Sequence, residues 1–213
     1  MRAVIFANGV MKSWPADFSV DPQRDLVIAA DGGSRLCRQW QVEPQVVIGD
    51  LDSIDPAELS RLEQRGAEII RHPARKDHTD LELALQLACR RSAREIFILG
   101  ALGRRWDMTL ANVMLLTADF LAEIPVRILD GREVLFLLKG GAGRPLRGEP
   151  GDGVSLVPLT TAATGVTLEG FSYPLRNEDL PQGATLGISN SLQSPKARIS
   201  LREGLLLVIH HRQ

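Results

Sequence analysis

The chain has 213 residues, 44% of them hydrophobic, and its 25 Lys and Arg residues nearly balance its 26 Asp and Glu residues, for a formal net charge of −1. Such a chain is long enough to bury one large core or two small ones. A net charge this close to zero argues against general attraction to nucleic acid or to an anionic membrane, so neither is expected as a partner.

The chain shows no features of a secreted or membrane protein. The apolar run at the amino terminus meets a turn too early for a signal peptide, and no later run approaches the length that spans a bilayer. Cys37 and Cys89 lie in no CxxC pattern and fall in stretches that predict helix interiors, so both are expected to be buried free thiols. We therefore expect a cytoplasmic protein.

From residue 2 to about residue 130, short apolar runs alternate with amphipathic stretches, as in the strand and helix units of a parallel sheet. The predicted strands are Arg2–Ala7, Leu26–Ala30, Val46–Ile48, Glu68–Ile70, Glu95–Leu99 and Val126–Leu129. Apolar residues at helical spacing predict helices at Pro56–Gln64, Leu81–Arg90 and Leu110–Phe120, which are expected to cover the faces of the sheet. Residues 1–130 are therefore expected to form a doubly wound α/β domain with a mostly parallel sheet.

The pattern changes at residue 131, where Gly and Pro become frequent and helical periodicity disappears. Short apolar runs at Val154–Leu159, Val166–Leu168 and Thr185–Ile188 are separated by turn residues, which is typical of an all-β domain. The segment Ala197–His211 predicts a final hairpin that turns at Arg202–Gly204. We expect residues 131–213 to form this second domain.

Charged residues and glycines follow the predicted strands, at the positions where ligands bind in an open parallel sheet. These segments are Asn8-Gly9, Asp31-Gly32-Gly33, Gly49–Ser53, Lys76–Asp80 and Gly100–Asp107, and they contain six aspartates. Gathering that many carboxylates at one edge costs on the order of several kcal/mol unless cations or protons intervene. A bound divalent metal is the simplest compensation.

Two of these segments have a structural interpretation beside the functional one. Asp50-Leu51-Asp52 has a spacing that suits Mg²⁺, but an isolated pair of this kind is more often a strand end before a capped helix, here at Asp55-Pro56. Thr79 and Glu82 fit a capping box with Asp80 in the first helical turn. The preceding Lys76-Asp77 is not needed for a cap and suits a phosphate and its metal.

The other segments leave the same choice open. Gly32-Gly33 permits close approach of a nucleotide, or forms only a tight turn between strand and helix. Arg104 and Arg105 offer bidentate donors to phosphate, or make structural ion pairs, and Asp107 is a candidate N-cap for the next helix. Trp106 is expected to be a packing anchor more than a stacking partner for a substrate ring.

Taken in order, Ala30–Gly33, Gly49–Ile54, Lys76–Glu82 and Gly100–Asp107 closely resemble the motifs of thiamine pyrophosphokinases, and Gly187–Asn190 resembles their thiamine-binding segment. The resemblance implies an α/β catalytic domain followed by a β-sandwich domain. It also implies a homodimer whose active site lies between the catalytic domain of one subunit and the β domain of the other. In the implied reaction the thiamine hydroxyl attacks the β-phosphorus of ATP, and thiamine diphosphate and AMP are formed with Mg²⁺.

The resemblance also assigns roles to residues. Asp50, Asp52 and Asp80 are implied as magnesium ligands; Asp31, Lys76, Asp77, Thr79, Arg105 and Asp107 as neighbours of the nucleotide phosphates; and Ser189 and Asn190 as contacts of the pyrimidine ring. Asn8, Gly32 and Gly33 are placed with the nucleotide-binding residues. Lys76 and Arg105 are expected to neutralise developing charge, and Asp77 and Asp107 are the candidates for orienting or deprotonating the hydroxyl. The chain departs from the family at Arg104, where a glycine is common, and at Met108, where a histidine is common.

Three other functions compete with this one. A phosphohydrolase of the haloacid dehalogenase type shares the Asp-x-Asp motif after an apolar strand, but that motif is expected at the first strand and lies here at the third. A non-catalytic sensor of nucleotide or thiamine would not need so many carboxylates. A pyrophosphokinase for another heteroaromatic alcohol, such as a pterin, differs only in the acceptor, and only Ser189-Asn190 favours thiamine.

Overall fold

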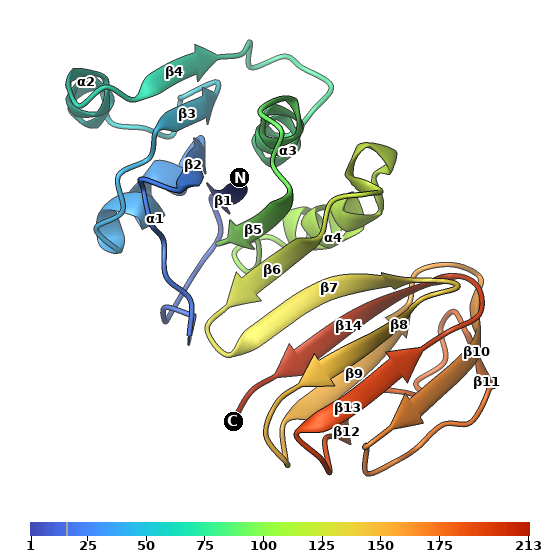
Figure 1. Ribbon diagram of the computed structural model, residues 1–213. Coiled ribbons are helices and arrows are strands. Elements are labelled where there is room, and N and C mark those ends of the chain that lie inside the picture. The colour runs from blue at the N-terminus through green and yellow to red at the C-terminus, as the bar shows by residue number, and fades with distance from the viewer. Residues whose placement is uncertain (16) are drawn as a thin grey trace. The chain divides into compact units, whose positions relative to one another are not determined.

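The computed structural model describes residues 1–15 and 17–213, and the chain divides into two compact units, Met1–Gly131 and Arg132–Gln213 (Figure 1). Each unit has its own cluster of buried apolar side chains. Within the described residues, every helix is too short or too polar to cross a membrane.

The first unit contains a sheet of parallel strands. They are β1 (Arg2–Phe6), β2 (Asp25–Ala30), β3 (Val46–Gly49), β4 (Glu68–Arg71), β5 (Glu95–Leu99) and β6 (Val126–Asp130), in the spatial order β6-β5-β1-β2-β3-β4. The predicted strands and the doubly wound α/β class are therefore confirmed. The central strand β2 is buried along its whole length, as expected for a parallel sheet that is covered on both faces.

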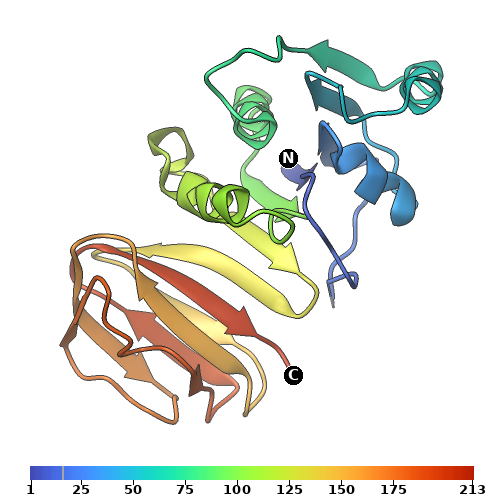
Figure 2. The same cartoon turned by 180° about the vertical axis from the view of Figure 1, so that it is seen from behind.

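The helices of this unit are α1 (Gly33–Gln39), α2 (Pro56–Gln64), α3 (Asp80–Arg90) and α4 (Trp106–Met114). After β4 the chain reverses its direction along the sheet, so right-handed crossovers place α1 and α2 on one face and α3 and α4 on the other (Figures 1 and 2). The prediction of a helix at Leu110–Phe120 is wrong in its bounds, because the α-helix begins at Trp106 and gives way to 3₁₀ turns after Met114. Cys37 is a buried thiol in α1 as expected, whereas Cys89 in α3 is only partly buried.

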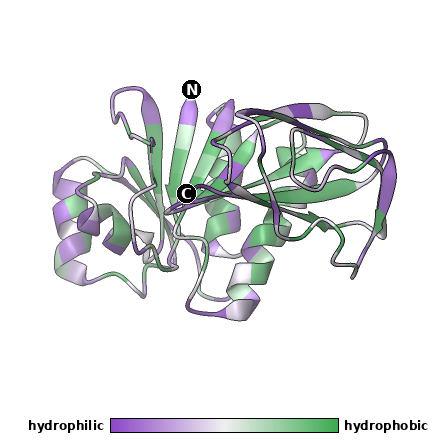
Figure 3. Ribbon diagram, turned by 90° about the horizontal axis from the view of Figure 1, so that it is seen from below, coloured by the Kyte–Doolittle hydropathy of each residue, from purple (hydrophilic) through white to green (hydrophobic). Residues whose placement is uncertain are grey.

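The second unit consists of two antiparallel sheets. One has the order β12 (Asn190–Ser191), β9 (Gly153–Pro158), β14 (Leu205–His211) and β7 (Glu133–Lys139); the other has the order β11 (Glu178–Pro181), β10 (Ala162–Glu169), β13 (Lys196–Ser200) and β8 (Gly143–Arg147). Side chains from both sheets, among them Leu156 and Leu168, form one core. Figure 3 shows hydrophobic residues along the strands, and the core shared by the two sheets makes this unit a sandwich, as predicted.

Two local predictions for this unit are wrong. Ala197–His211 is not a hairpin, because β13 pairs with β8 and β10 while β14 pairs with β7 and β9, so the turn at Arg202–Gly204 carries the chain from one sheet to the other. The run Thr185–Ile188 lies in a turn instead of a strand, and Ile188 is 43% exposed. Both segments have strand-like composition, but composition does not say which strand is the partner.

A buried pair of side chains, Asp152 and His210, lies in the sandwich near the carboxyl end of the chain. The Nε2 atom of His210 lies 2.8 Å from Oδ2 of Asp152, and the backbone N–H groups of Glu149 and Gln213 donate to the same carboxylate at 3.1 and 3.0 Å. Burial by itself raises the pKa of Asp152, but the donors together hold this pKa below its usual value. The carboxylate thus ties the chain end to the turn before β9.

We expect Asp152→Ala to destabilise the fold by about 2–4 kcal/mol, because it leaves buried donors without an acceptor. Thermal unfolding and amide exchange at Glu149 and Gln213 measure this effect. A carboxylate whose pKa is lowered on folding stabilises above its unfolded pKa and loses that contribution as the pH falls through its folded pKa. The difference between the wild type and the variant should therefore shrink in acid, while the exposed-site control Glu169→Ala should match the wild type throughout.

Candidate active site

The turn after β2 holds a buried carboxylate in a strained backbone conformation. Asp31 has a φ of 44°, in the left-handed region, and its backbone N–H donates to the carbonyl of Ile48 at 2.8 Å. The residue is only 5% exposed, and its Oδ1 atom has no hydrogen-bond partner among the described residues. A buried carboxylate oxygen without a donor is costly, so this position favours an external cation or donor.

The next two residues allow the turn to pack closely on the end of β1. A β-carbon at Gly33 would lie 1.9 Å from the Phe6 carbonyl oxygen, and one at Gly32 would lie 2.5 Å from the side chain of Asn8. Only glycine fits at position 33, where the contact is with backbone, whereas a β-carbon at position 32 would require the Asn8 side chain to move. Close packing between strand and helix therefore accounts for Gly32-Gly33 without a ligand.

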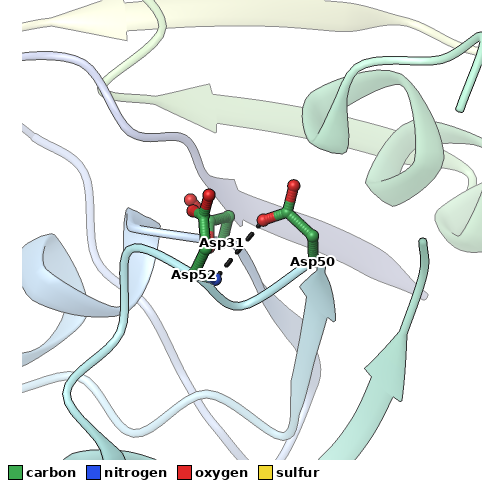
Figure 4. Close-up of side chains that lie close together, drawn as sticks. All are labelled: Asp31, Asp50 and Asp52. Carbon is green, nitrogen blue, oxygen red and sulfur yellow. Dashed lines mark hydrogen bonds between the residues drawn. The ribbon is translucent and has the colours of Figure 1, made fainter. Parts of the chain in front are cut away.

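The loop after β3 brings two more carboxylates to Asp31. Carboxylate oxygens of Asp31, Asp50 and Asp52 all lie within 4.8 Å of one another (Figure 4). Leu51, between the two loop aspartates, has a φ of 66°, and the N–H of Asp52 donates to Asp50 at 3.4 Å. The cap of α2 is made by Asp55, which accepts from the Ala57 N–H at 2.8 Å, so neither Asp50 nor Asp52 is needed for it.

Lys76 links this cluster to the start of α3. Its Nζ atom lies 3.3 Å from Asp50 and 3.0 Å from Asp80, and its side chain is only 14% exposed. Burial disfavours the charged ammonium, yet the two carboxylates raise the pKa of Lys76 above its usual value. Burial raises the pKa of Asp50 as well, but the Asp52 N–H and Lys76 outweigh it and lower that pKa.

Asp80 differs from Asp50 in its electrostatics. Burial raises its pKa, the charges of Asp31 and Asp50 add to this effect, and Lys76 only partly offsets it. The two carboxylates that share one ammonium are thus shifted in opposite directions. This difference is typical of sites that bind a cation or handle protons.

The predicted cap of α3 is half confirmed. Thr79 is the N-cap, and its hydroxyl accepts from the Glu82 N–H at 3.2 Å. Glu82 does not return the bond, since its carboxylate lies 3.0 Å from Nδ1 of His78. Asp77, just before the cap, is exposed and forms no hydrogen bond or ion pair among the residues that the structure describes.

The loop before α4 departs from two predictions. The helix begins at Trp106 with Arg105 at the N-cap position, so Asp107 lies in the first turn and is not the cap. Trp106 is 82% exposed and is not a packing anchor. Arg105 and Asp107 pair with each other at the surface, and the guanidinium lowers the pKa of the carboxyl.

A cavity of about 420 Å³ lies among these segments. It is lined by residues from the ends of β1, β2 and β5 and from the starts of α3 and α4, including Asn8, Asp31, Asp80, Arg105 and Asn112. Asn112 was not predicted: it is 5% exposed, donates to the Ala101 carbonyl at 2.7 Å, and has no partner for Oδ1 among the described residues. A polar residue inside the apolar run Leu110–Met114 is the sequence signal that points to it.

Ser189 and Asn190 belong to the second unit. Ser189 is exposed, has a φ of 58°, and its backbone N–H donates to the Ser155 hydroxyl at 3.0 Å. The Asn190 side chain is buried and bonds both backbone groups of Tyr173, at 3.0 and 2.7 Å. Asn190 therefore holds the segment in shape, while the Ser189 side chain is accessible to a ligand.

The first unit is thus a doubly wound α/β domain with an acidic, lysine-bridged site at the carboxyl edge of its sheet, and the second is a β-sandwich. Residues 20–128 match the family described as "Thiamin pyrophosphokinase, catalytic domain", and residues 145–206 match "Thiamin pyrophosphokinase, vitamin B1 binding domain". The chain belongs to the thiamine pyrophosphokinase family.

Individual relatives are similar to this chain in sequence and in structure over nearly its whole length. The thiamine pyrophosphokinase of Bacillus subtilis is 31% identical over 205 residues, 96% of each chain. Its crystal structure superposes with a TM-score of 0.88 at 28% identity, and that of a family protein from Enterococcus faecalis with a TM-score of 0.87 at 27% identity, each covering 100% of both chains. The chain is therefore a transferase of thiamine metabolism that acts as a thiamine pyrophosphokinase.

We expect Lys76→Met to raise the pKa of Asp50, because it removes the ammonium that favours the ionised carboxylate. A carbon-detected NMR titration of the aspartate carboxyls in the full chain without added metal measures this. The control is Lys12→Met, at an exposed lysine that forms no ion pair with the site residues among the described part of the chain. An unchanged Asp50 titration in Lys76→Met would contradict the ion pair.

Proposed function

We propose that the cavity of the first unit binds ATP and that Mg²⁺ is held at the carboxylate cluster. The observation that carries this proposal is the group of Asp31, Asp50 and Asp52, with oxygens within 4.8 Å of one another and one buried Asp31 oxygen without a donor. Oxygen ligands of this kind suit Mg²⁺, which usually combines few carboxylates with substrate phosphates. When bound, the ion would neutralise phosphate charge.

In this proposal Asp50, Asp52 and Asp80 are ligands of the metal, and Asp31 is a fourth ligand. Lys76 holds Asp50 and Asp80 in place, at 3.3 and 3.0 Å, and is positioned to contact phosphate oxygens when the nucleotide enters. Arg105 lines the cavity and would neutralise the charge that develops on the transferred pyrophosphoryl group. In the proposed reaction the thiamine hydroxyl attacks the β-phosphorus of ATP and AMP leaves.

Of the two candidates for the base, Asp77 is better suited than Asp107. A carboxylate whose pKa is lowered is a weaker base, and Arg105 lowers the pKa of Asp107. Asp77 is exposed and free of protein partners among the described residues, so it is available to orient or deprotonate the hydroxyl. Thiamine would contact Ser189, and Asn190 would shape that segment.

We further propose a cytoplasmic homodimer in which the catalytic unit of one subunit and the β unit of the other complete a site. Each unit exposes apolar side chains that support this: Trp106, Leu110 and Met114 follow one another at i, i+4 and i+8 on α4 and are 82%, 62% and 48% exposed. In the β unit, Tyr173, Leu186 and Ile188 are 70%, 50% and 43% exposed. Patches of this kind mark interaction surfaces.

The reaction is tested by incubating the chain with ATP and Mg²⁺, with and without thiamine. AMP should form only with thiamine; phosphate release without thiamine as the sole activity would refute the proposal in favour of a hydrolase.

We expect Asp50→Asn to lower kcat by at least about 100-fold, by analogy with the loss of other charge-stabilising groups, with little change in Tm. Asp119→Asn, at an exposed aspartate outside the site, serves as the control.

The dimer is tested by Leu110→Glu, which places a charge in the middle of the exposed stripe of α4. Sedimentation of the wild type should show a dimer, and the variant should be monomeric or dissociate at least about tenfold more readily, since a desolvated charge is costly at an interface. Glu123→Ala, at an exposed position beyond the helix, should leave the dimer unchanged. A monomeric wild type would contradict the proposed assembly.

A further inference from the structure

A pair of arginines at the edge of the proposed nucleotide cavity is left without carboxylate partners. Nη2 of Arg35 donates to Oδ1 of Asn8, and Nη1 of Arg104 donates to the same atom at 3.2 Å. Within the described part of the chain, neither guanidinium has a carboxylate within 4.0 Å. By contrast, Arg61 pairs with Glu43 and Glu58.

Two like charges that converge on one neutral oxygen repel each other. Each arginine has five N–H donors, and the bonds to Asn8, together with a 3.4 Å bond from Arg35 to the Gly32 carbonyl, use only some of them. The remaining donors of both guanidiniums are available to one ligand. An anion between them would remove the repulsion and satisfy the free donors.

The backbone conformation of Arg104 also supports a role for its side chain. Its φ of 60° lies in the left-handed region, where a side chain is disfavoured and glycine is not. The arginine thus occupies a conformation that glycine would adopt with less strain, so its side chain contributes something that glycine does not supply.

The cavities place this pair beside the proposed site. A second cavity of about 320 Å³ is lined by Gly9, Gly32, Arg35 and Arg104, among others, and it shares Gly9 and Arg104 with the 420 Å³ cavity that contains Asp31 and Asp80. A polyphosphate that entered both would meet Asp31 and Asp80 in the larger cavity, Arg104 in both cavities and Arg35 in the smaller one.

We propose that Arg35 and Arg104, positioned by Asn8, form an anion subsite. This subsite lies outside the carboxylate cluster and binds one phosphate group of the nucleotide donor. The identity of this ligand rests on the proposed use of ATP. Because both guanidiniums are exposed, their contribution is screened by salt and is greatest at low ionic strength.

The test is calorimetric titration of the full chain with ATP and Mg²⁺ at low salt and at physiological salt. Arg35→Gln and Arg104→Gly should each raise the Kd of ATP about tenfold at low salt and reduce its salt dependence, because each removes a charged hydrogen-bond donor. Arg104→Gly should also fold at least as stably as the wild type. The matched control is Arg38→Gln, on the same helix, which faces Glu58 at 4.0 Å and lines neither cavity.

An unchanged ATP Kd in both variants, or the same weakening in Arg38→Gln, would overturn the subsite. Thiamine-dependent AMP formation by the wild type is measured in parallel and separates the two proposals. A wild type that forms AMP while both variants bind ATP normally refutes the subsite alone. A wild type that forms no AMP refutes the proposed reaction, whereas the response of ATP binding to the arginines still decides the subsite.

Discussion

The register of the parallel strands determines where the acidic turns of the first unit lie. Phe6 pairs with Ala29 and Leu99, and Ala30 pairs with Ile48, so the chain leaves each of these strands at nearly the same height. The turns that follow must then share one edge of the sheet. Acidic residues in these turns are brought within a few ångströms because of strand register and not because of their distance along the chain.

The resulting charge density explains the local geometry of the site. Asp31 and Leu51 adopt left-handed backbone conformations that turn the chain sharply after β2 and β3, and Lys76 is held between Asp50 and Asp80. One ammonium cannot neutralise all the carboxylates, which leaves the site with a net negative charge and a buried oxygen without a donor. Arg104 lines both cavities and Arg35 lines the smaller one, so positively charged side chains lie beside the acidic cluster.

The two units match different domains of the family, the catalytic domain and the vitamin B1 binding domain. The α/β unit carries the acidic edge, the lysine and the arginines, whereas the sandwich contributes the exposed turn at Ser189, which Asn190 holds through its bonds to Tyr173. Each unit also leaves apolar side chains in solvent, most clearly Trp106 on α4. Exposed apolar patches of this kind are the observation on which the proposed dimer depends.

The sequence alone determined the α/β class, the six strands of the first unit, the family, and the convergence of Asp31, Asp50, Asp52, Lys76 and Asp80, because strand periodicity and motif order are local properties. It did not determine which sheet each β-strand joins, so a crossing between sheets was predicted as a hairpin at Arg202–Gly204. Nor did it reveal the exposed Trp106, the pairing of Arg105 with Asp107, or the buried Asn112. Those depend on which face of α4 meets the sheet and on contacts between distant segments, and only the tertiary structure decides them.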